Sequence, residues 1–325
     1  MGNTNNKMKQ FLSINDVENL ENLIQDALEY KKNPLKDENL AKGKTLGLIF
    51  MNSSLRTRMS TQKAAENLGF KVMTFNAGQD FWAWETEDGA VMNGTTVEHI
   101  KDAATVIGQY CDVVAIRCFA DLKNKKSDTE EKILTLFQKY LNKPLISMEA
   151  ATRHPLQSLA DTITIKEQWK ETRKPKVVLT WGPHIKPIPH AVANSFAEWM
   201  NAQDVDFVIT HPEGLDLDPA FVGGAQVTNN QEEALKDADF VYIKNWSSFN
   251  DYGKVAEGYD DWMLTEEKMK ITNNGKPMHC LPVRRNVEVS DEVLDSEQSL
   301  IFEQSYNRLF AAQAVLKNIF VMFSR

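Results

Sequence analysis

The sequence is poor in cysteine and has no long apolar run. Its 325 residues include three cysteines, Cys111, Cys118 and Cys280, and no CxxC pair. Three cysteines cannot all pair, so we expect a protein of the reducing cytoplasm and not a secreted disulfide framework. Without CxxC or HxxxH pairs we expect no zinc site. No apolar run approaches the roughly 20 residues of a membrane-spanning helix, which predicts no membrane segment.

Net positive charge and nucleotide-binding signatures are also missing. The formal charge is -8 at pH 7, which argues against a nucleic-acid-binding groove. Basic residues that bind an anion must therefore be concentrated locally. There is no GxGxxG, so a dinucleotide-binding enzyme is unsupported. Gly43-Lys44-Thr45 resembles the end of a P-loop, but Glu38 stands where the first P-loop glycine belongs, which argues against a Walker ATPase.

The composition is that of a globular protein with a sizeable core. Hydrophobic residues make up 42% of the chain and charged residues 25%, and the length favours two domains. Strand and helix patterns alternate in both halves. The expected strands cover 45–51, 71–75, 112–117, 145–148, 176–180, 206–210, 240–244 and 277–280. The expected helices cover 13–30, 59–68, 97–109, 130–140, 189–200 and 303–320.

This alternation predicts an α/β fold with two doubly wound parallel-sheet domains and a C-terminal helix that returns to the first domain. We expect the two domains to cover 8–152 and 153–302, followed by the helical segment 303–325. Open parallel sheets bind their ligands beyond the carboxyl ends of the strands. Because the polar motifs below each follow a predicted strand, we expect them at these edges.

The segment 54–58, Ser-Leu-Arg-Thr-Arg, follows a buried strand and opens a helix. A helix N-terminus offers unpaired N–H groups and the positive end of the helix dipole, which suits a phosphate. Two hydroxyls and two guanidiniums add donors, and arginine can grip a phosphate bidentately. The alternative is an ordinary helix cap with two solvated arginines.

Two histidine motifs follow later strands. The segment 154–157, His-Pro-Leu-Gln, begins a helix, and its His and Gln can donate to a carbonyl oxygen. The segment 279–282, His-Cys-Leu-Pro, precedes an Arg-Arg-Asn run. The alternatives are that His154 only caps its helix and that Cys280 is a buried small hydrophobe.

Charged and aromatic residues near other strand ends complete the candidates. Glu149 and Lys244 could together bind the charged groups of an amino acid, although each alone is more often a solvated charge. The segment 78–85 is rich in aromatic residues, including Trp82, and reads as a loop. A tryptophan there needs a ligand or another subunit to cover it, unless it packs into the chain's own core.

Together these motifs resemble the aspartate/ornithine carbamoyltransferase superfamily. S-x-R-T-R, H-P-x-Q and H-C-L-P occur in that order, the segment 303–309 is similar to the family's stretch ending in N-R-L, and the resemblance covers nearly the whole chain. The stretch D-x-x-x-S-M-G of ornithine transcarbamylase is missing, and 242–246 reads Tyr-Ile-Lys-Asn-Trp instead. Segments 80–82, 89–94, 180–184 and 281–286 resemble the N-acetylornithine and N-succinylornithine carbamoyltransferases.

The resemblance implies a homotrimer of arginine biosynthesis that needs neither metal nor redox cofactor. It implies a carbamoyl phosphate site formed by Ser54, Leu55, Arg56, Thr57, Arg117, His154, Gln157, Cys280, Leu281 and Arg308, with Trp82 reaching in from a neighbouring subunit. It implies an N-acylornithine site formed by Glu149, His184, Lys244, Leu281 and Arg284. Of these residues, the resemblance implies catalytic roles for Arg56, on the phosphate, for His154 and Arg308, on the carbonyl, and for Cys280, at the border of the reacting centre. No general base is assigned, because the leaving phosphate can take the amine proton.

Two positions depart from the resemblance and bear on the acceptor. Acetyl-specific relatives are similar around Val97 but have Glu there, and succinyl-specific relatives have Pro. Valine neither repels a succinyl carboxylate nor fills its pocket, which favours N-succinylornithine, unless Val97 only packs a helix start. Glu288 stands where acetyl-type relatives can have a carboxylated lysine. N-acetylornithine, free ornithine or putrescine, and a catalytically silent homologue are the alternatives.

Overall fold

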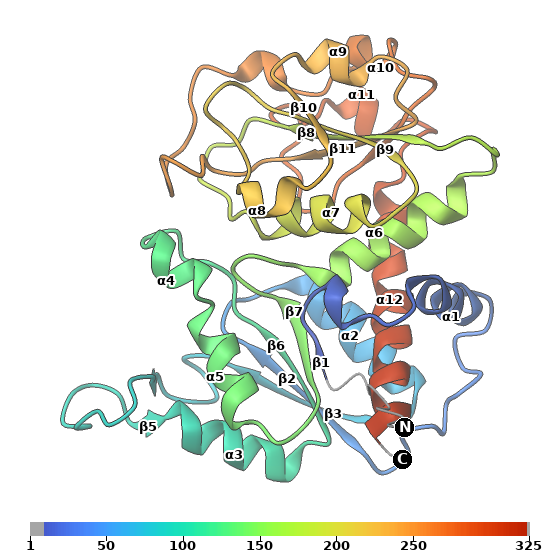
Figure 1. Ribbon diagram of the computed structural model, residues 1–325. Coiled ribbons are helices and arrows are strands. Elements are labelled where there is room, and N and C mark those ends of the chain that lie inside the picture. The colour runs from blue at the N-terminus through green and yellow to red at the C-terminus, as the bar shows by residue number, and fades with distance from the viewer. Residues whose placement is uncertain (1–9, 324–325) are drawn as a thin grey trace, which may run out of the picture. The chain divides into compact units, whose positions relative to one another are not determined.

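The computed structural model describes residues 10–323, which form two compact units (Figure 1). Unit 1 contains the described residues up to Phe119, together with Lys126–Leu156 and those from Arg308 onward. Unit 2 contains Ala120–Lys125 and Gln157–Asn307. The predicted first domain begins at residue 8, which lies outside the described residues, as does the end of the predicted last segment.

Unit 1 is built on a five-stranded parallel sheet with the strand order β1-β7-β6-β2-β3. These strands are β1 (Gln10–Phe11), β7 (Leu145–Glu149), β6 (Val113–Arg117), β2 (Thr45–Phe50) and β3 (Lys71–Asn76). All residues of β6 are buried, as are all but the first of β2. Such continuous apolar strands are typical of a parallel sheet that is covered on both faces.

Helices cover both faces of this sheet (Figure 1). They are α1 (Leu20–Lys32), α2 (Leu55–Asn67), α3 (Ile100–Tyr110), α5 (Lys132–Tyr140) and the later part of α12 (Ile301–Phe323). The short α4 (Lys125–Thr129), which has no buried residue, lies apart from the sheet, and a short η1 (Ile14–Asp16) follows β1. On one face, Ile100 and Ala104 of α3 and Phe137 of α5 share a core with Val114 and Ile116.

The other face holds the C-terminal helix. Gln313 of α12 accepts a hydrogen bond from Asn67 of α2 at 3.2 Å, and Lys317 pairs with Asp26 of α1 at 2.7 Å. The prediction of a C-terminal helix that returns to the first sheet domain is thus confirmed. The predicted domain boundaries themselves stay a prediction.

Unit 2 contains a second five-stranded parallel sheet, with the order β10-β9-β8-β11-β12. Its strands are β8 (Lys176–Trp181), β9 (Asp206–Thr210), β10 (Gln226–Thr228), β11 (Phe240–Lys244) and β12 (Lys276–Met278). Its helices are α6 (Pro155–Gln168) from Gln157 onward, α7 (Ala191–Asn201), α8 (Pro219–Val222), α9 (Gln231–Leu235), η2 (Asp260–Trp262), α10 (Glu266–Met269), α11 (Asp291–Leu294) and the first part of α12. The predicted α/β class with two parallel-sheet domains is confirmed.

Several element boundaries differ from the predictions for local reasons. The helix predicted from residue 13 begins at Leu20, because Ser13 and Asp16 form a capping box on η1 and Asn19 caps α1. Helix α2 begins four residues before the predicted Met59, directly after Ser54. The strands β1 and β10 were not predicted, since two or three residues are too few to show a periodicity.

The helix predicted from residue 97 begins at Ile100, because the two residues before it form a strand. Glu98–His99 is β5, which pairs with β4 (Trp84–Glu85) in a small two-stranded sheet. Among the helices that the structure describes, none combines the length and the apolar character needed to cross a membrane.

Candidate active site

The segment 54–58 forms the first turn of α2, at the carboxyl end of β2. The Ser54 hydroxyl accepts a hydrogen bond from the Thr57 N–H at 3.4 Å and donates to Thr57 Oγ1 at 3.0 Å. Thr57 is buried, Arg56 is half-buried and Leu55 is exposed. Backbone N–H groups of the first helical turn have no partner inside the helix, so this turn can bind an anion.

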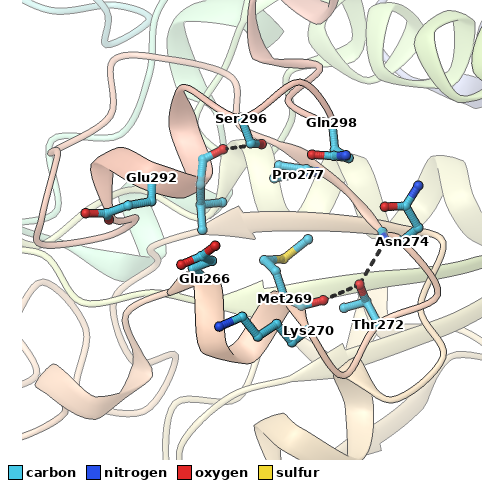
Figure 2. Close-up of a pocket in the computed structure, with 11 residues that line it drawn as sticks. Glu266, Met269, Lys270, Thr272, Asn274, Pro277, Glu292, Ser296 and Gln298 are labelled. Carbon is cyan, nitrogen blue, oxygen red and sulfur yellow. Dashed lines mark hydrogen bonds between the residues drawn. The ribbon is translucent and has the colours of Figure 1, made fainter.

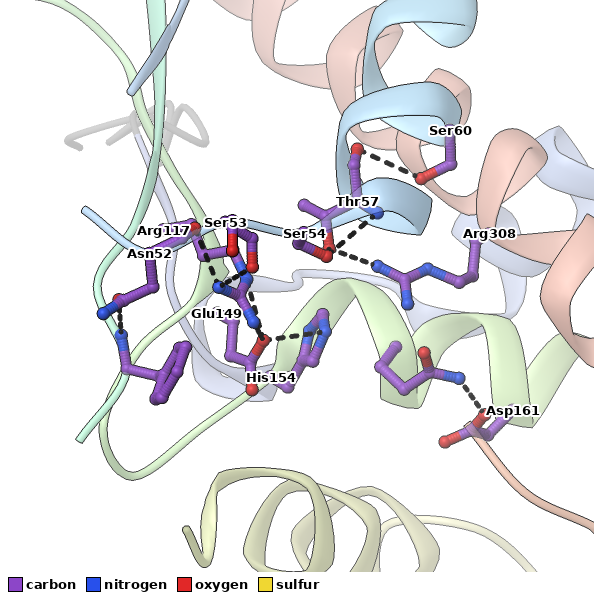
Figure 3. Close-up of polar contacts among 12 residues, drawn as sticks. Asn52, Ser53, Ser54, Thr57, Ser60, Arg117, Glu149, His154, Asp161 and Arg308 are labelled. Carbon is purple, nitrogen blue, oxygen red and sulfur yellow. Dashed lines mark hydrogen bonds and ion pairs between the residues drawn. The ribbon is translucent and has the colours of Figure 1, made fainter. Parts of the chain in front are cut away.

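Arg308 of α12 brings a second cation to this turn (Figure 3). Its Nη2 donates to Thr57 Oγ1 at 2.7 Å, and the side chain is only 5% exposed. A positive charge is unfavourable at the positive end of a helix dipole unless an anion also binds there. The buried guanidinium therefore makes the start of α2 an electropositive site in unit 1.

Arg117, at the end of β6, ties two strand ends together. Its Nε and Nη2 donate to Glu149 Oε2 at 3.0 and 2.8 Å, and its Nη1 donates to the carbonyls of Asn52 and Ser53. The loop that leads into α2 is thereby joined to the end of β7. Figure 3 shows Glu149 among the residues around Ser54, so this predicted acceptor residue lies with the predicted phosphate residues in unit 1.

His154 lies directly before α6 and is 3% exposed. Its burial, followed by the charges of Arg308 and Arg117, lowers its pKa well below 6.5. The imidazole is therefore neutral at pH 7, and its contact with Glu149, at 3.6 Å, is neither an ion pair nor a hydrogen bond. Nδ1 has no hydrogen-bond partner among the described residues. A neutral histidine with one nitrogen available can donate to a substrate oxygen.

Gln157, the last residue of the second motif, belongs to unit 2 and not to the unit of His154. It is buried, and its Nε2 donates to Asp161 Oδ1 at 2.8 Å. Asp161 Oδ1 also accepts from Gln304 Nε2 at 2.7 Å, and Gln304 Oε1 accepts from the His279 N–H at 2.9 Å. One N–H of the Gln157 side-chain amide is thus bound within the protein, in a hydrogen-bond network that extends to His279 of the His-Cys-Leu-Pro segment.

The acceptor residues predicted in the second half lie at strand ends of unit 2. His184 follows β8, and its Nε2 accepts from Arg284 Nε at 3.1 Å. Because a guanidinium can only donate, a neutral His184 carries its proton on Nδ1, which lies 2.8 Å from the Lys186 carbonyl oxygen and 3.0 Å from the Lys186 nitrogen. Burial is the main cause that lowers the pKa of His184, and Lys244 and Arg284 lower it further. A neutral His184 thus holds Arg284 in place.

Glu288 is a buried carboxylate that contacts His279 and the backbone of Arg284. Its Oε1 lies 3.4 Å from His279 Nε2, and its Oε2 accepts from the Arg284 N–H at 2.7 Å. Burial alone would raise the pKa of Glu288, but His279, Lys244 and the Arg284 N–H outweigh burial and lower it to about 2. The carboxylate is ionised at pH 7 and compensates the charge of Lys244, which is 7% exposed.

Cys280 and Leu281 lie just beyond β12, which ends two residues earlier than predicted. Cys280 is buried, and the Leu281 N–H donates to His279 Nδ1 at 2.9 Å. Leu281 has a φ of +55°. A leucine in the left-handed region costs roughly 1–3 kcal/mol, and such strain clusters at functional sites.

The two tryptophans of the segment 78–85 lie in different environments. Trp84 is buried, stacks on Phe81 with 4.4 Å between ring centroids and donates to Glu98, so it packs into the chain's own core. Trp82 is 67% exposed, and Val97 of the same region is 61% exposed. A side chain as large as Trp82 on the surface of one chain is typical of a contact with a partner or a ligand.

Some residues of these clusters were not predicted. The polar residue Asn76 ends β3, and it accepts from Arg58 and donates to Asp80, which anchors the segment before Trp82. A polar side chain at a strand end was the available signal for Asn76. Among the described residues, no group of three His, Cys, Asp or Glu side chains could hold a metal ion.

A separate pocket of about 360 Å³ lies in unit 2 (Figure 2). Its lining includes Glu266, Lys270, Asn274, Pro277 and Glu292, and none of the predicted site residues. It lies at the start of β12, whereas ligands of open parallel sheets bind at the carboxyl ends of strands. This pocket is therefore not a candidate for the active site.

Comparisons with known proteins agree with this geometry. Residues 9–167 match the family described as "Aspartate/ornithine carbamoyltransferase, carbamoyl-P binding domain", and residues 189–319 match its "Asp/Orn binding domain". The chain is 49% identical to the N-succinylornithine carbamoyltransferase of Bacteroides thetaiotaomicron, over 96% of this chain and 98% of the relative. It is 34% identical to the N-acetylornithine carbamoyltransferase of Xanthomonas axonopodis pv. citri, over 95% and 96%.

A solved structure extends the comparison to three dimensions. A variant of N-acetyl-L-ornithine transcarbamylase in which valine replaces one glutamate was solved with carbamyl phosphate and N-succinyl-L-norvaline. It superposes with a TM-score of 0.91 and 34% identity, covering 95% of this chain and 99% of that chain. On both sequence and structure, this chain belongs to the aspartate/ornithine carbamoyltransferase family and is a carbamoyltransferase.

Proposed function

We propose that the chain transfers the carbamoyl group of carbamoyl phosphate to the δ-amine of N-succinyl-L-ornithine, giving N-succinyl-L-citrulline and phosphate. The observation that carries this proposal is the buried Arg308 guanidinium on Thr57 at the start of α2, an anion site in a family of carbamoyltransferases. The 49% identity to an N-succinylornithine carbamoyltransferase supports the choice of acceptor.

The phosphate group binds at the first turn of α2. The N–H groups of this turn, including that of Leu55, and the hydroxyls of Ser54 and Thr57 donate to its oxygens. The guanidiniums of Arg56 and Arg117 neutralise its charge, with Trp82 of a neighbouring subunit covering it. Glu149 already orients the Arg117 guanidinium, so this side chain needs little reorganisation to bind the phosphate.

The reaction itself is an acyl-type transfer. The δ-amine attacks the carbamoyl carbon, a C–N bond forms and negative charge develops on the carbonyl oxygen. His154 and Arg308 donate to that oxygen and stabilise the charge. The C–O bond to phosphate then breaks, and the leaving phosphate takes the amine proton. Gln157, Cys280 and Leu281 border the carbamoyl group, and orienting the two substrates supplies much of the remaining acceleration.

The acceptor binds through charged groups of opposite sign. Lys244 and Arg284 bind its carboxylates, with His184 holding the Arg284 guanidinium. Glu149 attracts the terminal ammonium before it loses its proton, and the Leu281 backbone contacts the chain of the amino acid. We also propose that the enzyme works in arginine biosynthesis in the cytoplasm. We propose a homotrimer because the family resemblance implies one. The exposed Trp82, Val91 and Met92 support an interface at which a neighbouring subunit would cover them.

Val97 is proposed to select the succinyl group. By the family resemblance, Val97 stands where acetyl-specific relatives have a glutamate. The solved transcarbamylase variant with a glutamate replaced by valine was crystallised with an N-succinyl compound, which supports a permissive valine. Val97 is exposed within this chain, as expected for a side chain that faces a substrate or a neighbouring subunit.

Replacing Val97 by glutamate should lower kcat/KM for N-succinyl-L-ornithine by about 10- to 200-fold relative to N-acetyl-L-ornithine, because a carboxylate repels the succinyl carboxylate. Steady-state rates with both acceptors give this ratio. Val106→Glu is the matched control, because Val106 is also an exposed valine, on α3. An unchanged ratio in Val97→Glu would remove Val97 from the specificity site.

N-acetyl-L-ornithine is the second candidate acceptor, favoured by the 34% identity to an N-acetylornithine carbamoyltransferase. The test is citrulline formation with N-succinyl-L-ornithine, N-acetyl-L-ornithine, free ornithine and putrescine, side by side. We expect the succinyl compound to react fastest. Preference for the acetyl compound would keep the reaction and reject the acceptor, and no turnover with any amine would favour a silent homologue.

A further inference from the structure

Glu131 has an unfavourable backbone conformation for its residue type. It precedes α5 with φ +46° and ψ +46°, in the left-handed region. Glycine, asparagine and aspartate tolerate this region better than glutamate. Glu131 also occupies the N-cap of α5, yet its side chain makes no capping hydrogen bond. For α5 alone, an asparagine would serve both needs better.

The side chain of Glu131 instead reaches the loop before α6. Its Oε1 accepts from both the N–H and the hydroxyl of Thr152, each at 2.7 Å. The same loop is closed by a hydrogen bond from the Ala150 N–H to the Arg153 carbonyl at 2.8 Å. All these residues belong to unit 1. Glu131 therefore fixes the short connection between the end of β7 and the start of α6.

This connection carries a site residue at each end. Glu149 is the last residue of β7, and His154 is the residue directly before α6. Their side chains lie 3.6 Å apart, and Glu149 also orients Arg117. Cys118 lies close to both Glu131 and Glu149. Burial, and then the charges of these two carboxylates, raise the pKa of the Cys118 thiol to about 12. A shift of the loop would therefore move the donor that faces the carbamoyl oxygen.

We propose that Glu131 is a positioning residue, which holds the 150–153 loop so that His154 and Glu149 keep their reactive geometry. This inference rests on the proposed function, because it assigns His154 to the carbamoyl oxygen. Both Thr152 donors bind the same oxygen of Glu131, so a side chain of the same length that keeps one acceptor oxygen should preserve the tether.

The test compares Glu131→Asn with Glu131→Gln. Asparagine fits the left-handed conformation and can cap α5, but it is one methylene too short for Thr152. We expect Glu131→Asn to unfold at the same or a higher temperature while kcat falls by about 10- to 100-fold, since a misplacement of about 1 Å can cost 100-fold. Glutamine keeps the length and an acceptor oxygen, so Glu131→Gln should stay within about threefold of wild-type kcat.

The KM for carbamoyl phosphate should change less than kcat, because the first turn of α2 is untouched. Glu130→Asn, at an exposed neighbour, is the matched control and should keep wild-type kinetics. Near-normal kcat in Glu131→Asn, or equal loss in both Glu131 variants, would overturn the inference. Loss of stability in step with loss of activity would make Glu131 merely structural, which also overturns it. A wild-type enzyme inactive with every amine would instead overturn the proposed function, and this inference with it.

Discussion

Replacing Arg56 by alanine should lower kcat/KM for carbamoyl phosphate by about 100- to 1,000-fold while leaving the fold intact. Arg56 is half-buried on the first turn of α2, where unpaired N–H groups, Thr57 and Arg308 already favour an anion. Removing one charged donor from such a site removes a charge-assisted hydrogen bond to the phosphate, which strengthens as the phosphate leaves. Initial rates at varied carbamoyl phosphate measure the effect.

The matched control for Arg56→Ala is Lys63→Ala. Lys63 is an exposed cation on the same helix, so its removal changes the net charge and the helix composition in the same way. We expect Lys63→Ala to keep wild-type kinetics. Comparable kinetics in the two variants would mean that the first turn of α2 does not bind the phosphate of the substrate.

Replacing His154 by leucine should lower kcat by about 100- to 1,000-fold without destabilising the protein. His154 is buried, neutral and has an Nδ1 without a partner among the described residues. A buried unsatisfied nitrogen costs free energy, so an apolar side chain of similar size should fold as well or better. The loss of activity follows from the loss of a donor to the developing oxyanion. Opposite signs for activity and stability are the signature of a functional donor.

The same substitution should reduce the pH dependence of stability. The pKa of His154 lies well below 6.5 in the folded state, so below pH 6.5 the unfolded chain binds a proton that the folded chain does not. The free energy of unfolding therefore falls as the pH decreases from 6.5 towards the folded pKa. Urea unfolding at about pH 7.5 and about pH 5.5 should show a smaller difference for His154→Leu than for the wild type.

His190 provides the control for both readouts. Its burial lowers its pKa to about 4, and its contacts with Ser247, Phe249 and Tyr252 in unit 2 involve none of the proposed site residues. His190→Leu should also reduce the pH dependence of stability, but kcat should stay near the wild-type value. If His154→Leu kept normal kcat, His154 would be a packed core histidine and not a donor.

The strand and helix alternation predicted both the fold class and the edge at which the motifs lie. Thr45–Phe50, Val113–Arg117 and Phe240–Lys244 are mostly apolar, buried strands. Polar and charged side chains at or after their ends need partners, which a polar edge of the sheet provides. The helix N-terminus at Ser54 was predictable because Ser, Arg and Thr at these positions are a local signal.

What the sequence could not predict depends on tertiary contacts. Thr57 and Arg308 are 251 residues apart, and their hydrogen bond exists only because α12 returns to unit 1. The ion pair between Arg117 and Glu149 fixes the orientation of the Arg117 side chain, which the residue pattern of neither strand predicts. Glu131 lies in the left-handed region against its own preference, and its partner Thr152 is 21 residues away in sequence, so no local pattern predicts their contact.

The central claim is that the carbamoyl group moves from carbamoyl phosphate to the δ-nitrogen of an N-succinylated ornithine. The most direct test incubates the enzyme with carbamoyl phosphate labelled at its carbonyl carbon and an equimolar mixture of N-succinyl-L-ornithine, N-acetyl-L-ornithine and free ornithine. Mass spectrometry and NMR of the products then show which amine carries the label. We predict label at the δ-nitrogen of N-succinyl-L-citrulline, with one phosphate released per product. Label mainly in N-acetyl-L-citrulline or free citrulline, or in no product, would contradict the account.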